Sequence, residues 1–226
     1  MNFIREFKIM ISFFTMQTMC AGCLMMAMAL LSACGSSPPV RYYTLMDAAE
    51  GGGKTTSVRE VPSARAEFVL QILPVKIPAS IDVPQLVLRN GQGEMVILDD
   101  ERWLGPVGEE FRSALVSQLT RTLGTVQVSS LTATQKLPVY RIQINITRFD
   151  TLRGRYVLQD IDWSLRQITA EADQQEPERM LICASRQVVR PEDDSVAALV
   201  SAHQAALHRL GGMIVQTVRL PVWHCP

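Results

Sequence analysis

Cys34 has the most informative surroundings of any reactive residue in this chain. Leu31-Ser32-Ala33 precede it, and a polar tract over residues 35–39 follows it. Further upstream, residues 9–31 carry no charge and follow two basic side chains near the N-terminus. This order is typical of an export signal in which small residues fit a peptidase cleft and the cysteine receives lipid. We predict cleavage between Ala33 and Cys34, and a diacylglycerol and an N-acyl chain on Cys34.

Residues 9–31 are also long enough to serve as an uncleaved transmembrane anchor, because about 20 apolar residues span a bilayer. The Leu-Ser-Ala-Cys tetrapeptide and the abrupt change to Gly, Ser and Pro favour the lipoprotein signal. One acyl chain anchors a protein only marginally, whereas two or three chains on one cysteine hold it durably. We therefore expect residues 1–33 to be a removed signal peptide.

Two further patterns resemble known sites, but each fails a requirement. Cys20 and Cys23 have the spacing of a redox or metal pair, yet they lie inside the segment that we expect to be removed. Gly53-Lys54-Thr55 matches the end of a phosphate-binding loop, but that motif requires glycine at position 48, where the chain has alanine. We interpret this glycine-rich stretch as a flexible loop.

The histidines form no recognisable catalytic or metal-binding pattern. His203 and His208 are five residues apart, so on a helix they diverge by about 140° and are poorly placed to share a metal. The sequence contains no Gly-x-Ser-x-Gly turn and no His-Glu-x-x-His motif. Acidic residues 99–101 could hold a cation, but a solvated turn is the simpler interpretation. We predict no enzymatic activity, no metal and no cofactor other than the attached lipid.

Two cysteines remain after processing and lipidation, Cys183 and Cys225. An exported protein reaches an oxidising compartment, where two leftover thiols usually pair. We therefore expect a Cys183–Cys225 disulfide, with two separate buried thiols as the alternative.

Length and charge limit the class of protein. Removing 33 residues from 226 leaves 193, which suits a single domain. We expect residues 34–63 to form a lipidated N-terminus and flexible linker with one apolar island at 41–45, and residues 64–226 to form one globular domain. The 22 basic and 22 acidic residues give no electrostatic case for binding nucleic acid.

The hydrophobic pattern predicts strands and then a helix in the first half of the domain. Residues 68–73 form a short apolar run that ends at a proline, which is typical of a core strand. The runs at 85–89 and 94–98 flank Asn90-Gly91, a strong hairpin signal. Apolar residues then recur every four positions over 106–123, which predicts an amphipathic helix. Residues 126–129 could add a short strand.

The second half predicts a meander followed by a second helix. Apolar and polar residues alternate over 140–147, which indicates a half-buried strand that ends at Arg148-Phe149-Asp150. A partner begins at about residue 156, and 179–189 returns as a third antiparallel strand. The helix after Ser195 is interrupted at Gly211-Gly212, as a kink or as two helices. The predicted fold is α+β, with a mixed, largely antiparallel sheet packed by two amphipathic helices.

Several short motifs across the mature chain occur in the order found in a known family. They are Arg41 to Leu45, Leu73 to Pro78, Pro84 to Val87, Arg102 to Leu104, Arg148 to Asp150, and Trp163. Together with the Cys34 motif, they resemble the ABC-type transport auxiliary lipoproteins, the PqiC-like family. One departure is visible, because the family commonly follows the Arg-Trp pair with an acidic residue, Pro and Leu, whereas this chain has Leu104-Gly105-Pro106-Val107.

The resemblance implies an outer-membrane lipoprotein of Gram-negative bacteria, on the periplasmic face. Such a protein works with a mammalian-cell-entry (MCE) domain protein and inner-membrane components to move lipids, without catalysis and as a homo-oligomer. Gly35 agrees with the outer membrane, since an aspartate after the lipidated cysteine commonly retains a protein in the inner membrane. Arg102 and Trp103 are the candidate interaction corner, with plain core architecture as the alternative.

Other functions remain open at this point. The domain could be a stand-alone periplasmic protein that holds one lipid in an apolar cavity between its sheet and helices. It could also be a purely structural anchor of the envelope. Lipid that co-purifies with a monomer would favour the first of these alternatives.

Overall fold

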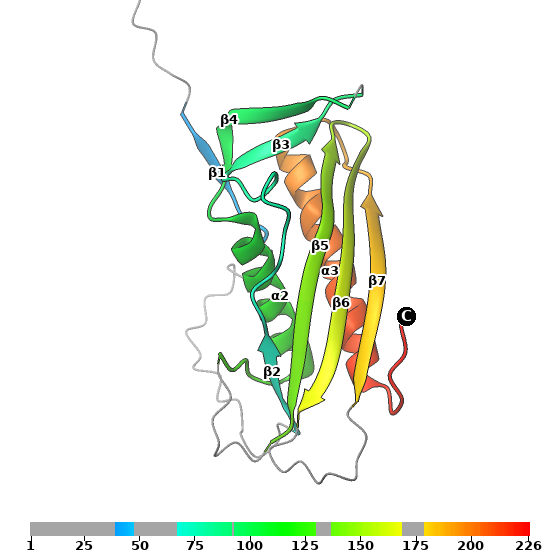
Figure 1. Ribbon diagram of the computed structural model, residues 1–226. Coiled ribbons are helices and arrows are strands. Elements are labelled where there is room, and N and C mark those ends of the chain that lie inside the picture. The colour runs from blue at the N-terminus through cyan, green and yellow to red at the C-terminus, as the bar shows by residue number, and fades with distance from the viewer. Residues whose placement is uncertain (1–38, 48–66, 92, 130–136, 169–178) are drawn as a thin grey trace, which may run out of the picture. The chain divides into compact units, whose positions relative to one another are not determined.

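A sheet with two helices against one of its faces forms the fold (Figure 1). The structure is a computed structural model that describes residues 39–47, 67–91, 93–129, 137–168 and 179–226. Every element named below belongs to one compact unit, Val40–Pro226. The layer arrangement confirms the predicted α+β class.

The sheet contains seven strands within the described residues, in the order β1-β4-β3-β5-β6-β7, with β2 paired to β5. The strands are β1 (Arg41–Tyr43), β2 (Val69–Ile72), β3 (Gln85–Arg89), β4 (Met95–Trp103), β5 (Val139–Leu152), β6 (Tyr156–Ile168) and β7 (Met180–Val189). The hairpin β3–β4 and the meander β5–β6–β7 are antiparallel, as predicted. The pairs β1–β4 and β2–β5 are parallel.

Strand β5 runs from Val139 to Leu152, so the expectation that it ends at Arg148-Phe149-Asp150 is wrong by two residues. Ile144 and Ile146 are buried, in line with the alternation seen in the sequence. The register with β6 shifts between Ile146 and Arg148, which is a β-bulge. The extra residue changes which alternate side chains face the core, so the next buried apolar side chain after Ile146 is Phe149. The strand therefore continues while its sequence pattern changes phase.

The linker prediction is also wrong for residues 41–47. The expected domain boundary was residue 64, but Arg41, Tyr42 and Tyr43 pair with β4 and belong to the folded unit. A three-residue strand is too short to show periodicity, so its partner, about 60 residues later in the chain, cannot be inferred locally. The expected strand at 126–129 is reduced to a single bridge between Gln127 and Leu70.

Two helices cover the inner face of the sheet. Helix α2 (Val107–Leu123) follows Pro106 and ends at Gly124, which has the left-handed conformation (φ 65°) typical of a helix C-terminus. Helix α3 (Val196–Arg219) begins after Ser195, whose side chain accepts a hydrogen bond from the Ala198 amide. The core between the layers includes Phe111 and Trp163, which are almost fully buried.

Helix α3 runs without a break through Gly211-Gly212, contrary to the predicted interruption. Gly211 is buried against the Gln118 side chain of α2, and a side chain at Gly211 would occupy the same space as the Gln118 amide. The Gln118 Nε2 atom also donates a hydrogen bond to the His208 carbonyl (2.8 Å). Gly211 therefore permits close packing of two helices and does not end one of them.

Neither helix in the described part of the chain is long and apolar enough to span a bilayer.

Candidate functional site

The predicted cleavage, lipidation and sorting residues, Ala33, Cys34 and Gly35, lie outside the described residues. The description begins at Pro39, five residues after Cys34. The contacts that hold residues 39–47 on the domain are therefore the structural feature nearest to the expected anchor.

Strand β1 fixes this segment at the edge of the sheet. Its parallel register with β4 places Arg41 beside Glu101. The Arg41 guanidinium forms an ion pair with the Glu101 carboxylate, which is buried. Burial raises the pKa of the Tyr43 phenol, and a hydrogen bond with Glu101 raises it further. The edge strand is thus held by side-chain contacts as well as by its backbone pairing.

Both helices hold the residues that follow β1. Glu110 of α2 accepts hydrogen bonds at Oε2 from Thr44 Oγ1 (2.6 Å) and from the Leu45 amide (3.0 Å). Gln204 of α3 donates from Nε2 to the carbonyls of Thr44 (3.0 Å) and Met46 (3.1 Å). Sequence reasoning missed both roles, because neither Glu110 nor Gln204 belongs to a motif that signals a long-range contact.

The predicted interaction corner divides into a buried and an accessible part. Trp103 is only 4% exposed, and its ring packs edge-on against Phe149 and His203. Arg102 is partly exposed and donates from Nε to the Asp99 carbonyl (3.2 Å). Leu104, where the chain departs from the family pattern, is 68% exposed. Arg102 and Leu104 can therefore reach a partner directly, whereas Trp103 supports them from the core; the interaction role stays a prediction.

His203 is a core residue. It is 1% exposed, lies 2.7 Å through Nε2 from Thr151 Oγ1, and stacks on Phe149 at a centroid distance of 4.1 Å. Its Nδ1 atom lies 3.2 Å from Gln159 Nε2. Burial lowers the pKa of His203 to about 3, so the ring is neutral at ordinary pH. Among the described residues, no group of three or more His, Cys, Asp or Glu is placed to hold a metal ion.

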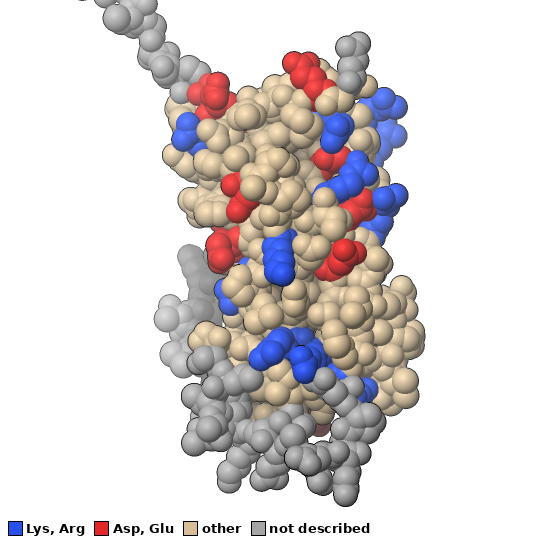
Figure 2. All heavy atoms as spheres, viewed as in Figure 1, with Lys and Arg blue, Asp and Glu red and all other residues tan. Residues whose placement is uncertain are grey.

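The outer face of the sheet carries a network of ion pairs near the β5–β6 bulge. Asp150 is buried and contacts the guanidinium groups of Arg148 and Arg89. Asp160 accepts two hydrogen bonds from Arg186, at 2.6 and 2.9 Å. Figure 2 shows acidic and basic residues interleaved on this face. The network links β3, β5, β6 and β7.

Replacing Asp150 by asparagine is expected to lower the free energy of unfolding at pH 7 by about 1–2 kcal/mol, because two charge-assisted hydrogen bonds are weakened while both arginines reach solvent. Burial raises the pKa of Asp150, but hydrogen bonds and charge from Arg148 and Arg89 outweigh it and hold the pKa below its ordinary value. The stabilisation is therefore present above about pH 4 and lost as the pH falls through the lowered pKa.

Urea unfolding of the two proteins between pH 7 and pH 3 checks this expectation. The difference in unfolding free energy should shrink below about pH 4. A difference that stays constant down to pH 3 would show that the Asp150 charge is not its source.

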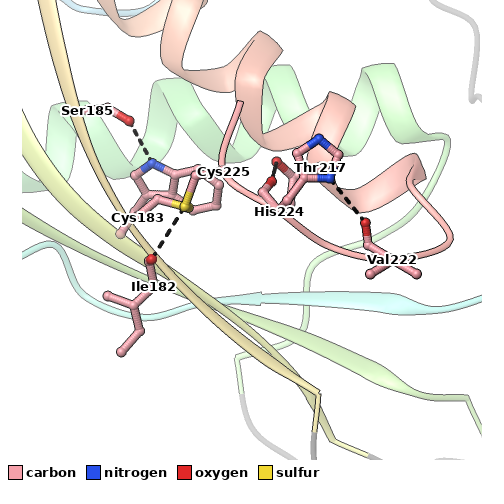
Figure 3. The surroundings of a disulfide bond; sticks show 8 residues. Ile182, Cys183, Ser185, Thr217, Val222, His224 and Cys225 are labelled. Atoms are coloured by element: carbon pink, nitrogen blue, oxygen red, sulfur yellow. Dashed lines mark hydrogen bonds between the residues drawn. A yellow bond between two sulfur atoms is a disulfide. The ribbon is translucent and has the colours of Figure 1, made fainter.

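Cys183 and Cys225 form a disulfide (Figure 3). Cys183 is buried on β7, and the bond attaches the C-terminal tail to this edge strand. Arg179 also holds the tail, because its Nη2 atom donates to the Pro221 carbonyl (2.9 Å) and its guanidinium lies 4.4 Å from the Trp223 ring centre. The pairing inferred from the compartment is therefore present in the structure.

Two cavities are relevant to ligand binding. A surface groove of about 390 Å³ lies between residues 45–47, α2 and α3, and its lining mixes apolar side chains with Gln118, Arg121 and His208. Its size falls within the range of small-molecule sites. The second cavity, beside Trp103, has a volume of only about 10 Å³, close to the minimum for one water molecule. Sequence reasoning missed the groove, because it depends on the N-terminal segment packing across both helices.

The fold has relatives among solved structures, while the search of curated proteins gives no match. An uncharacterised protein superimposes with a TM-score of 0.60 at 15% identity, covering 80% of this chain and 99% of that one. A protein from Xanthomonas campestris gives a TM-score of 0.44 at 17% identity, covering 66% of this chain and 81% of its own. The first of these supports the fold alone.

A comparison with protein families gives more information than the fold alone. The matched region runs from Tyr43, the last residue of β1, to Val215 in α3, and so includes all the strands of the meander, helix α2 and all but the last four residues of α3. The model of the ABC-type transport auxiliary lipoprotein component family matches residues 43–215, and the chain belongs to this family.

Proposed function

We propose that this protein is a non-catalytic lipoprotein that docks the periplasmic part of an ABC-type lipid transport system at the outer membrane. The family match over residues 43–215 carries the proposal. The partner is an MCE-domain protein that forms the periplasmic conduit and is joined to inner-membrane components. The docking unit is a homo-oligomer of this chain on the periplasmic face.

The attachment of β1 supports a docking role. Only four residues lie between Cys34 and Pro39, and the segment that follows is bound to β4, α2 and α3. A domain held so close to its lipid anchor has little freedom to move away from the membrane. Gly35 directs the lipidated protein to the outer membrane. The protein therefore contributes a fixed position for a partner.

The cavity between the sheet and α3 gives no support to a lipid carrier. Its volume of about 10 Å³ is far too small for an acyl chain. The groove of about 390 Å³ between the helices favours a second candidate function, binding of a small amphipathic ligand at the surface. Stoichiometric lipid in the purified protein would favour that candidate over docking.

Crosslinking in intact cells tests the docking proposal. A photoreactive residue at position 102 or 104, both at the accessible corner, is expected to capture an MCE-domain protein. Mass spectrometry of the captured complex identifies the partner.

A further inference from the structure

Exposed apolar side chains line the end of the domain at which β1 begins. We define the apolar tip as Val40, Tyr42, Met95 and Ile97, which are between 39% and 60% exposed. They come from β1, from the residue just before it, and from the hairpin arm of β4, which lie at the same end of the unit (Figure 1).

The strand registers explain why these side chains reach solvent. Ile97 pairs with Val87, and Tyr42 pairs with Arg102, so both point to the face of the sheet that carries no helix. On the opposite face of these strands, Leu88 and Trp103 are buried. Tyr42 and Ile97 are 60% and 56% exposed, which is high for large apolar side chains on paired strands.

The length of chain before β1 limits how far the tip can lie from the anchor. Five residues lie between Cys34 and Val40, and even a fully extended chain from Cys34 to Val40 spans at most about 20 Å. The ion pair of Arg41 with Glu101 holds β1 on the sheet, so β1 does not lengthen this tether. A lipid on Cys34 therefore keeps the tip within reach of the bilayer surface.

We infer that the apolar tip contacts the lipid surface to which Cys34 is anchored, with Tyr42 at the level of the headgroups. The inference rests on the lipid anchor of the proposed function. A short tether raises the effective concentration of the surface to the millimolar range, so weak apolar contacts are enough. Tyrosine suits such an interface, because its ring is apolar and its hydroxyl stays hydrated.

The charges near the tip indicate that the contact is apolar and does not depend on anionic lipid. Arg41 and Arg102 carry positive charge on β1 and β4, while Glu94, Asp99, Asp100 and Glu101, the partner of Arg41, carry negative charge on or next to β4. Positive charge does not dominate, so electrostatic attraction to an anionic bilayer is weak. We expect the contact to be insensitive to salt.

A fluorescent label tests the contact in the full-length lipidated protein. Cysteine replaces Ile97 in one variant and Ile182 in the other, and each new thiol is labelled with an NBD dye while the native disulfide stays intact. Ile182 is the matched control, because it is 66% exposed on the same face of the sheet. It lies near the start of β7, beside the disulfide, at the end of the meander that is far from the tip.

The labelled proteins are reconstituted into phosphatidylethanolamine–phosphatidylglycerol vesicles, with and without nitroxide-labelled lipid. The dye at position 97 is expected to shift to the blue and to lose most of its emission to the nitroxide, in low and in high salt. The dye at position 182 should keep both its emission maximum and its intensity.

Flotation of the vesicles reports the anchor separately from the tip. Proteins that float without preferential quenching at position 97 would overturn the tip contact and leave the anchor in place. A blue shift at position 97 without nitroxide quenching would show that another protein copy covers the tip, and it would also overturn the inference. Failure to float would overturn the anchor and the inference together.

Discussion

Replacing Cys34 by alanine is expected to abolish labelling of the protein by a palmitate analogue and to release it from the membrane fraction. Each buried methylene of an acyl chain contributes about 0.8 kcal/mol to membrane binding, so loss of two or three chains removes the main attachment. The fold should be unchanged, because the folded unit begins at Val40. Metabolic labelling, fractionation and circular dichroism measure the three expectations.

Cys23 provides the matched control for this variant. It lies in the same N-terminal region, in the segment that we expect to be removed, so replacing Cys23 by alanine should leave lipid labelling and attachment unchanged. Attachment that survives in the Cys34→Ala variant would instead support an uncleaved transmembrane anchor over residues 9–31.

Reducing the Cys183–Cys225 disulfide is expected to lower the free energy of unfolding by about 3–4 kcal/mol. The bond closes a loop with a sequence separation of 42. A loop of this length loses much of its conformational entropy in the unfolded chain when it is crosslinked. Urea unfolding with and without reductant measures the difference, and the intact mass should rise by two hydrogen atoms on reduction.

Replacing Cys225 by serine separates the bond from the buried thiol. Cys183 is 4% exposed, whereas Cys225 is exposed, so the Cys225→Ser variant leaves the core side chain in place. This variant should match the stability of the reduced protein and should not respond to reductant. A wild-type protein whose stability and mass are unaffected by reductant would contradict the assignment of the bond.

The regular parts of the fold could be predicted because their sequence pattern is local. Alternation over residues 140–147 indicated the central strand, and Asn90-Gly91 indicated the hairpin; both are present. The bulge after Ile146 was missed because one extra residue changes the phase of the pattern. Gly211 looked like a helix break because its packing partner, Gln118, is on another helix.

The contacts around the N-terminal segment depend on residues that are distant in sequence. Arg41 and Glu101 are 60 positions apart, and Thr44 and Gln204 are 160 apart. No periodicity or motif links such positions. The resemblance to the family was recognised from short motifs in order, while the contacts of β1 with β4 and of residues 44–46 with both helices required the three-dimensional structure.

Crosslinking from the accessible corner is the most direct test of the docking proposal. A photoreactive residue replaces Leu104 in the lipidated protein in intact cells, and the same residue replaces Ile182 as the control at the other end of the sheet. We predict capture of an MCE-domain protein from position 104, little capture from position 182, and loss of capture in the Cys34→Ala variant. A tethered protein that captures no component of a lipid transport system from either position would contradict the proposal.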